Sequence, residues 1–177
     1  MTPFKRLVGY LKPYRAGLIF GGSCVFVTNL FKLIAPNVVG EAIDALKKEG
    51  TTQHTMLWYG LTLLVVALAQ GTFLFTQRRV LINMSRHIEY DLRNDFYAHL
   101  QKLPFQFYQT QRTGDLMARA TNDLSAVRMV VGPALMYSMN TLFATALLVP
   151  KMASIDWRLT LLAFMSMPLV VVATNYF

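Results

Sequence analysis

Residues 78–103 read RRVLINMSRHIEYDLRNDFYAHLQKL, with no glycine and no proline. Apolar residues recur along this stretch with a mean step of about 3.67 residues, close to the 3.6-residue period of an α-helix. Charged and polar side chains occupy the other faces, and an uncharged apolar segment directly precedes the stretch. We therefore predict a membrane-spanning helix that continues as an amphipathic helix roughly 40 Å into the cytoplasm. Its apolar positions are Leu81, Met84, Ile88, Leu92, Phe96, Leu100 and Leu103.

The stretch that follows has the signals of a tight turn. Pro104 disfavours a helical conformation at the residue before it, so the long helix is expected to end there. A short polar and aromatic segment then leads to Gly114. A second helix is expected to begin near Thr113 or Asp115, because either side chain can cap free backbone N–H groups. Residues 77–128 thus predict a cytoplasmic hairpin of two long helices.

The tip of this hairpin carries three aromatic residues, Phe105, Phe107 and Tyr108. Exposed aromatic side chains that gather at one point are typical of a docking surface for a partner. The alternative is a solvated structural arm with no partner.

Four segments are long and apolar enough to cross a bilayer, which takes roughly 20 helical residues. They cover residues 16–39, 56–76, 129–150 and 157–177. The preceding segment, residues 1–15, mixes basic and apolar residues, which suits a helix lying along the inner membrane surface. The expected fold class is an all-α membrane protein with three to four transmembrane helices.

Composition supports a membrane protein over a nucleic-acid-binding protein. Of 177 residues, 54% are hydrophobic and only 15% are charged, yet the net charge is +8. Four basic residues lie in the N-terminal segment and eight lie between Arg78 and Arg128. Because positive charge favours the cytoplasmic side, we expect the N-terminus and the hairpin inside, facing anionic lipid of the inner leaflet. Nucleic acid is excluded as a partner because the basic residues alternate with acidic ones and no binding motif is present.

No catalytic or metal site is expected. Cys24 is the single cysteine, and the three histidines are dispersed rather than clustered. No Ser/His/Asp, Cys/His or paired-carboxylate arrangement gathers near a membrane interface, so a membrane enzyme is the weakest of three functional hypotheses. A small multi-span scaffold or regulatory protein that docks a cytosolic partner is the second.

Several short motifs, taken in order and with their spacing, resemble the transmembrane domain of ATP-binding-cassette (ABC) exporters, and this resemblance gives the first hypothesis. The opening Leu11-Lys-Pro-Tyr-Arg15 is similar to the elbow segment of that family, which divides the chain into an elbow, residues 1–15, and a partial transmembrane domain, residues 16–177. The other matching positions are Pro36, Gly40 and Asp44 at the outer end of the first span, and Phe107, Tyr108, Gly114, Leu116, Arg119 and Asp123 in the hairpin.

The resemblance implies a role for the hairpin tip. In such exporters a coupling helix at this position contacts the nucleotide-binding domain, and the long helices transmit its motion to the translocation pathway. The residues that would make this contact are Phe107, Tyr108, Gln109, Thr110, Gln111, Arg112, Thr113 and Gly114. The resemblance also implies a multi-pass protein of the cell inner membrane and a second transporter half, identical or different. ATP and Mg²⁺ would bind the nucleotide-binding domain, and the cargo would be a small amphipathic molecule.

Four of the polar residues inside the predicted spans are candidates to line a pathway. Asn29, Gln70 and Asn140 could line a pathway or make interhelical hydrogen bonds, and Lys32 could line it or extend its amine to the outer interface. Arg119 and Asp123 are four residues apart and could pair on one helix face.

The sequence also departs from a complete exporter half. It contains neither a Gly-x-x-x-x-Gly-Lys-[Ser/Thr] phosphate-binding loop nor the Leu-Ser-Gly-Gly-Gln signature, so this chain is not expected to hydrolyse ATP. It ends within the fourth predicted span. We therefore expect the N-terminal part of a transporter, with a non-functional truncated fragment as an alternative.

Overall fold

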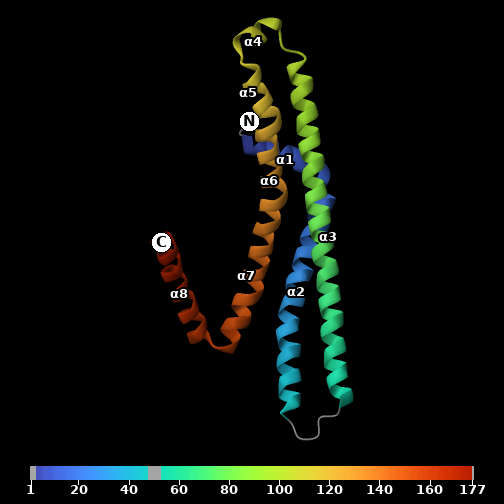
Figure 1. Ribbon diagram of the computed structural model, residues 1–177, viewed down its shortest axis with the longest axis vertical. Coiled ribbons are helices and arrows are strands. Elements are labelled where there is room, and N and C mark those ends of the chain that lie inside the picture. The colour runs from blue at the N-terminus through green and yellow to red at the C-terminus, as the bar shows by residue number, and fades with distance from the viewer. Residues whose placement is uncertain (1–2, 48–52, 177) are drawn as a thin grey trace.

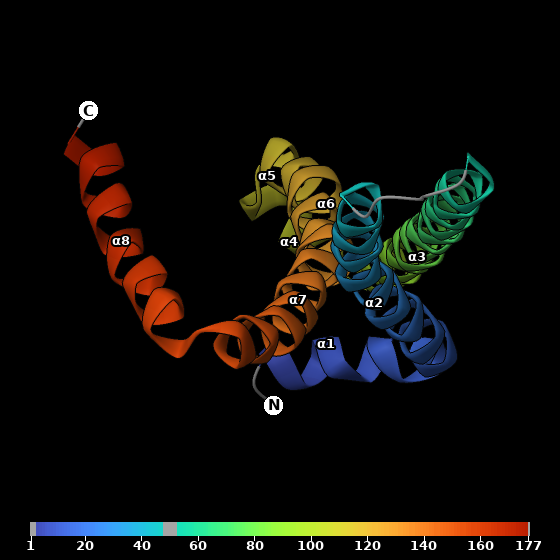
Figure 2. The same ribbon diagram turned by 90° about the horizontal axis from the view of Figure 1, so that it is seen from below.

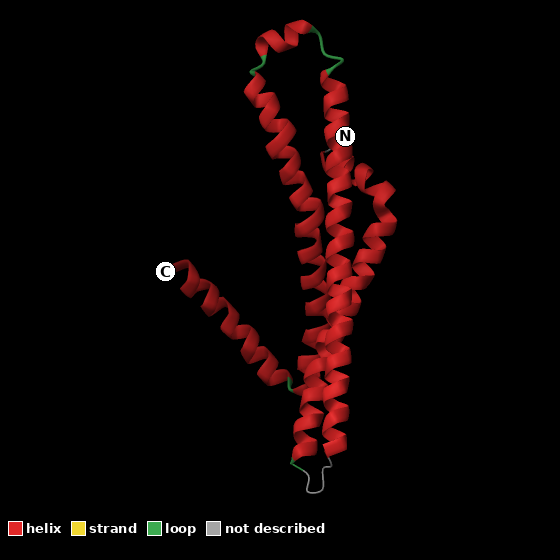
Figure 3. Ribbon diagram, turned by 45° about the vertical axis from the view of Figure 1, so that its right-hand side comes forward, coloured by secondary structure: helices red, strands yellow, loops and turns green. Residues whose placement is uncertain are grey.

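The computed structural model describes residues 3–47 and 53–176, and within these ranges the chain is helical with no strand (Figure 1; Figure 3). The predicted all-α fold class is confirmed. The elements are α1 (Pro3–Leu11), the 3₁₀ turn η1 (Lys12–Tyr14), α2 (Arg15–Leu46), α3 (Gln53–Leu100), α4 (Phe105–Thr110), α5 (Thr113–Ala118), η2 (Arg119–Asp123), α6 (Leu124–Met129), η3 (Val130–Ala134), α7 (Leu135–Ile155) and α8 (Trp157–Tyr176). Both η2 and η3 are π-helical.

Four helical stretches are long and apolar enough to cross a membrane: Leu7–Leu46, His54–Leu100, Thr113–Ile155 and Trp157–Thr174. The four predicted spans coincide with these stretches over most or all of their length. Three of the stretches are far longer than a bilayer requires, because a span needs only about 20 residues. The surplus of the second and third stretches forms the long hairpin in Figure 1.

The core lies where α2, α3 and the helix that runs from α6 to α7 meet. The apolar positions predicted from the helical period supply much of it, because Leu81, Met84 and Ile88 are all buried. Val25 of α2 and Met136 of α7 complete the contact from the other two sides. The same apolar face of α3 therefore serves the membrane part and the beginning of the hairpin.

Two glycines let these helices approach closely. A Cβ atom at Gly21 would lie 2.6 Å from Cδ2 of Leu81, and one at Gly132 would lie 2.4 Å from Oγ of Ser85. Only a residue without a side chain fits at either place, since real Cβ contacts are never that short. Gly17, four residues before Gly21, would give an ordinary contact of 3.8 Å to Met84.

The structure corrects the predicted end of the long helix. α3 ends at Leu100 rather than at Leu103, and residues 101–102 form a turn. Pro104 has ψ 154°, an extended conformation, and stands as the residue before α4. The physical reason is that proline disfavours a helical conformation at the residue before it and is well suited to the start of a helix. α3 therefore ends before Leu103, and α4 begins directly after Pro104.

α8 diverges from the other helices. After Ile155 the chain turns sharply, and α8 runs away from the bundle (Figure 1; Figure 2). Asp156 caps this helix, because its Oδ1 accepts hydrogen bonds from the backbone N–H of Arg158 at 2.8 Å and of Leu159 at 3.3 Å. Among the α8 residues whose burial is described, only Thr160, near the start of the helix, is buried.

Candidate functional site

The tip helix α4 bridges the far ends of α3 and α5 (Figure 3). Extended residues bound it on both sides, Pro104 before it and Gln111 after it. The backbone N–H of Gln111 donates to the carbonyl of Phe107 at 3.0 Å and closes the helix. The tip is therefore a defined helix set across the hairpin, and it covers residues 105–110, whereas the predicted contact set covers residues 107–114.

The three aromatic side chains of the tip have different surroundings. The rings of Phe107 and Tyr108 meet edge to face, with centroids 5.5 Å apart. The Tyr108 hydroxyl donates to the carbonyl of Leu100 at 2.6 Å, which ties α4 to the end of α3. Phe105 is 76% exposed and has no such tie.

The most exposed aromatic residue of the tip is thus Phe105. The contact set implied by the resemblance left it out, although the sequence places it among the three aromatic residues of the tip. The other members of the predicted contact set, Gln109, Thr110, Gln111, Arg112, Thr113 and Gly114, are all exposed.

Arg119 pairs with a different carboxylate from the one suggested by spacing. Its Nε lies 3.1 Å from Oδ2 of Asp115, and both side chains are largely exposed. Asp123 closes the π-helical segment η2, in which hydrogen bonds span five residues rather than four. The Arg119 side chain leans toward the N-terminus of its helix, where an acid four residues before a base pairs better than one four residues after it, so the predicted Arg119–Asp123 pair does not form. Leu116 is half-buried on the same helix.

Glu89 of α3 joins the two hairpin helices through Arg128 of α6. We call the level of this Glu89–Arg128 pair the neck of the hairpin. Oε1 of Glu89 lies 2.8 Å from Nη2 of Arg93 on the same helix, and its Oε2 lies 3.1 Å from Nε of Arg128 on α6. The Glu89 side chain is only 16% exposed. A carboxylate shared by two arginines on different helices fixes their relative position.

Replacing Glu89 with alanine is expected to lower the free energy of unfolding by about 1–3 kcal/mol, because two charged hydrogen bonds are lost at a largely buried site. Thermal unfolding of the purified chain in detergent measures this. Asp115→Ala is the matched control, since its pair with Arg119 is exposed and contributes at most about 1 kcal/mol. Equal destabilisation by the two changes would contradict a special role for Glu89.

The structure brings together two of the four candidate pathway residues, Asn29 and Asn140. Asn29 Nδ2 donates to Oδ1 of Asn140 at 3.1 Å and to the carbonyl of Val25 at 2.8 Å. Asn29 is 2% exposed, so this bond joins α2 to α7 inside the bundle. Gln70 is half-buried and Lys32 is exposed.

The motif residues near the outer end of the first span lie on α2. Pro36 is inside this helix and exposed, and a Cβ atom at Gly40 would meet nothing within 4 Å. Asp44 forms an exposed pair with Lys47 at 3.8 Å. These positions have no contact in the described structure that assigns them a chemical role.

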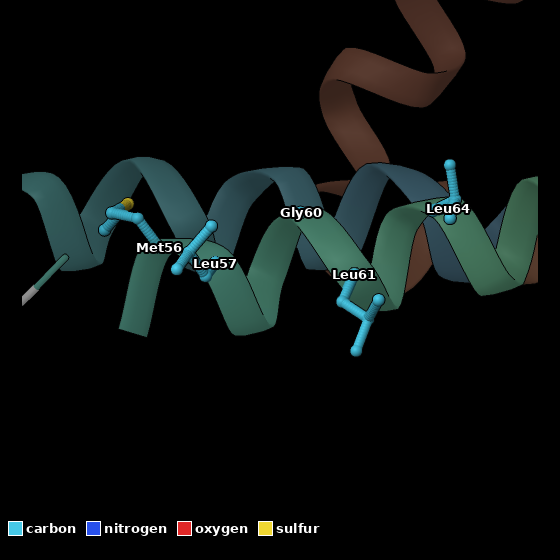
Figure 4. A pocket seen from close by; sticks show the side chains of 5 residues that line it. All are labelled: Met56, Leu57, Gly60, Leu61 and Leu64. Atoms are coloured by element: carbon cyan, nitrogen blue, oxygen red, sulfur yellow. The ribbon is translucent and has the colours of Figure 1, made fainter. Parts of the chain in front are cut away.

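A shallow groove of about 640 Å³ lies at the opposite end of the molecule from the tip. Figure 4 shows that its five lining residues, Met56, Leu57, Gly60, Leu61 and Leu64, all come from α3. The lining has no side-chain donor or acceptor, so the groove offers no polar chemistry. Within residues 3–47 and 53–176, no group of His, Cys, Asp and Glu side chains could hold a metal ion.

Long apolar helices, a helical hairpin that extends beyond the spans and an exposed tip helix define a multi-pass α-helical membrane protein. The chain belongs to the family of ABC transporter transmembrane regions, whose model matches residues 18–177.

Curated relatives match nearly the whole chain. It is 28% identical over 173 residues to the multidrug resistance-like ATP-binding protein MdlA of Escherichia coli K12, covering 97% of this chain and 29% of that protein. It is 28% identical over 174 residues to the probable multidrug resistance ABC transporter ATP-binding/permease protein YheI of Bacillus subtilis, covering 98% and 30%. It is 26% identical over 171 residues to the ATP-dependent lipid A-core flippase of Syntrophus aciditrophicus, covering 97% and 28%. The chain therefore spans less than a third of the length of these relatives.

Proposed function

We propose that this chain forms the first part of the membrane domain of an ATP-driven exporter that moves a small amphipathic molecule across the cell inner membrane. Membership of the ABC transporter family supports this proposal. The names of its relatives, which include multidrug resistance proteins and a lipid A-core flippase, support an amphipathic cargo. ATP and Mg²⁺ would act on a nucleotide-binding domain, and a second transporter half would complete the pathway. Asn29, Lys32, Gln70 and Asn140 are the candidates to line that pathway.

The observation that carries the coupling role is the exposed Phe105 on a tip helix whose other aromatic residues are held in place. A partner that pushes on α4 would move α3 directly, because Tyr108 is bonded to the end of that helix. Exposed aromatic residues next to arginine are typical of the energetic centre of a protein interface, and Arg112 directly follows the tip helix. A nucleotide-binding domain is the partner that this family supplies at such a position.

The coupling role is tested by alanine substitution at the tip of the complete transporter that contains this chain. ATP hydrolysis and ATP-driven movement of a fluorescent amphipathic dye are measured on the same proteoliposomes. Loss of dye movement with hydrolysis preserved supports the proposal, whereas unchanged dye movement overturns the assignment of the tip.

The proposed orientation places the tip in the cytoplasm and the α2–α3 connection outside. A cysteine at His54 is therefore expected to react with a membrane-impermeant maleimide on intact cells, and a cysteine at Gln111 to react only after the cells are opened. Both positions are exposed. The native Cys24 is 3% exposed and serves as the internal blank. The reverse labelling pattern would overturn the orientation.

A further inference from the structure

Two tyrosines of the N-terminal segment bind two aspartates of α3. The Tyr10 hydroxyl donates to Oδ2 of Asp95 at 2.5 Å, and the Tyr14 hydroxyl donates to Oδ2 of Asp91 at 2.7 Å. Each pair of residues is four apart, which places both tyrosines and both aspartates on consecutive helical turns. The result is a two-rung connection between segments 85 and 77 residues apart in the chain.

Apolar packing beside the two hydrogen bonds supports the same connection. Leu7 and Leu11, on the same side of the N-terminal segment as the tyrosines, pack against the buried core cluster, as does Leu92 of α3. The Tyr14 ring also lies 6.3 Å from the His87 ring, centroid to centroid. The phenols are therefore held in position by packing, which lowers the entropic cost of each hydrogen bond.

The connection lies at the level of the neck. Glu89, which joins α3 to Arg128 of α6, is two residues before Asp91. Neither Asp91 nor Asp95 forms an ion pair with another residue in the part of the chain that the structure describes. The phenols thus supply the charged hydrogen bonds of these two carboxylates, a type of bond about twice as strong as one between neutral groups.

We propose that Tyr10 and Tyr14 are positioning residues that latch the N-terminal segment to the hairpin, so that α1 and α3 move as one body during transport. The transport part of this proposal rests on the proposed function. A surface helix fixed to the hairpin would keep the neck at the membrane surface while the tip moves. Without the latch, a displacement of the tip would make α3 slide relative to α1 and would not move the two helices together.

The latch is tested first on this chain alone, in lipid nanodiscs, by electron–electron double resonance. Spin labels are placed at Val8 of α1 and Asn94 of α3, both exposed, in a Cys24→Ala background. The distance distribution is expected to be narrow in the parent and to broaden in Tyr10→Phe/Tyr14→Phe, with the latched population reduced relative to the released one by about tenfold. The matched control is Tyr90→Phe/Tyr97→Phe, which removes two exposed phenols from α3. Equal distributions in the latch variant and the parent overturn the proposal, as does equal broadening in the control.

A second set of variants separates the hydrogen bond from bulk stability. Asp91→Asn/Asp95→Asn keeps a side-chain acceptor but not its charge and is expected to broaden the distribution only in part, whereas Asp91→Ala/Asp95→Ala removes the acceptor and is expected to broaden it fully. In the complete transporter, the Tyr10→Phe/Tyr14→Phe pair is expected to lower the amount of dye moved per ATP hydrolysed. If the tyrosine variant shows a broad distance distribution but moves as much dye per ATP as the parent, the role of the latch in transport is overturned. If the parent transporter itself moves no dye, the proposed function is overturned, and the distance measurement alone tests the latch.

Discussion

Alanine at Phe105 is expected to lower ATP-driven dye movement by at least about tenfold while ATP hydrolysis continues. Truncation of a central aromatic anchor costs an interface about 2 kcal/mol or more, which corresponds to a larger factor than ten. The ring is 76% exposed, so its removal does not disturb the packing of the hairpin itself. The measurement is the ratio of dye moved to phosphate released in proteoliposomes.

Tyr90→Ala is the matched control for this change. Tyr90 is also an exposed aromatic residue of the hairpin, 63% accessible, but it lies on the side of α3 and not at the tip. It is expected to leave the ratio unchanged. A Phe105→Ala transporter that couples as well as the Tyr90→Ala one would refute docking through the tip. Tyr108→Phe, which removes only the bond to Leu100, is expected to give an intermediate loss.

The second large effect is expected at Gly132. Replacing it with alanine forces a Cβ atom to within 2.4 Å of Ser85 Oγ and 2.6 Å of Ser85 Cβ, so α3 and the π-helical segment η3 must separate. Overpacking of this kind costs roughly 1–3 kcal/mol. We expect a clear fall in the thermal unfolding temperature of the chain in detergent.

Two further variants test whether steric overlap between the added methyl group and Ser85 causes the loss of stability in Gly132→Ala. Gly60→Ala adds the same methyl group where nothing lies within 4 Å, and it is expected to raise stability slightly because alanine favours a helix. Ser85→Gly combined with Gly132→Ala moves the small residue to the other helix and is expected to restore part of the loss. A Gly132→Ala protein as stable as the Gly60→Ala one would show that the two helices do not meet as described.

The regular parts of the fold could be predicted from the sequence because they depend on local periodicity. The apolar positions of residues 78–103 follow one helical face, and that face is buried at Leu81, Met84 and Ile88. The spans are equally local, since hydrocarbon thickness sets their length. The length of the hairpin follows from the absence of a helix breaker before Pro104.

The contacts that give the hairpin its rigidity could not be predicted in the same way. The Tyr14–Asp91 bond and the Glu89–Arg128 pair join residues distant in sequence, and no spacing rule relates them. The predicted partner of Arg119 was wrong for a local reason, because spacing alone does not say whether a base pairs with the acid four residues before it or four residues after it, and the structure has the former. Phe105 was predicted as one of three tip aromatics, but the family pattern begins two residues later, so the contact set implied by the resemblance omitted it.

The length of α3 has a mechanical consequence. This helix runs without interruption from Gln53 to Leu100. At about 1.5 Å per residue, some 54 Å of it lies between Gln53 and Glu89 and about 16 Å between Glu89 and Leu100. A rod that turns about a point near Glu89 has unequal arms, and it converts a small, forceful displacement at its short end into one about three times larger at its long end. If force enters at the tip as proposed, the geometry of this helix would favour a large displacement over a large force at its Gln53 end.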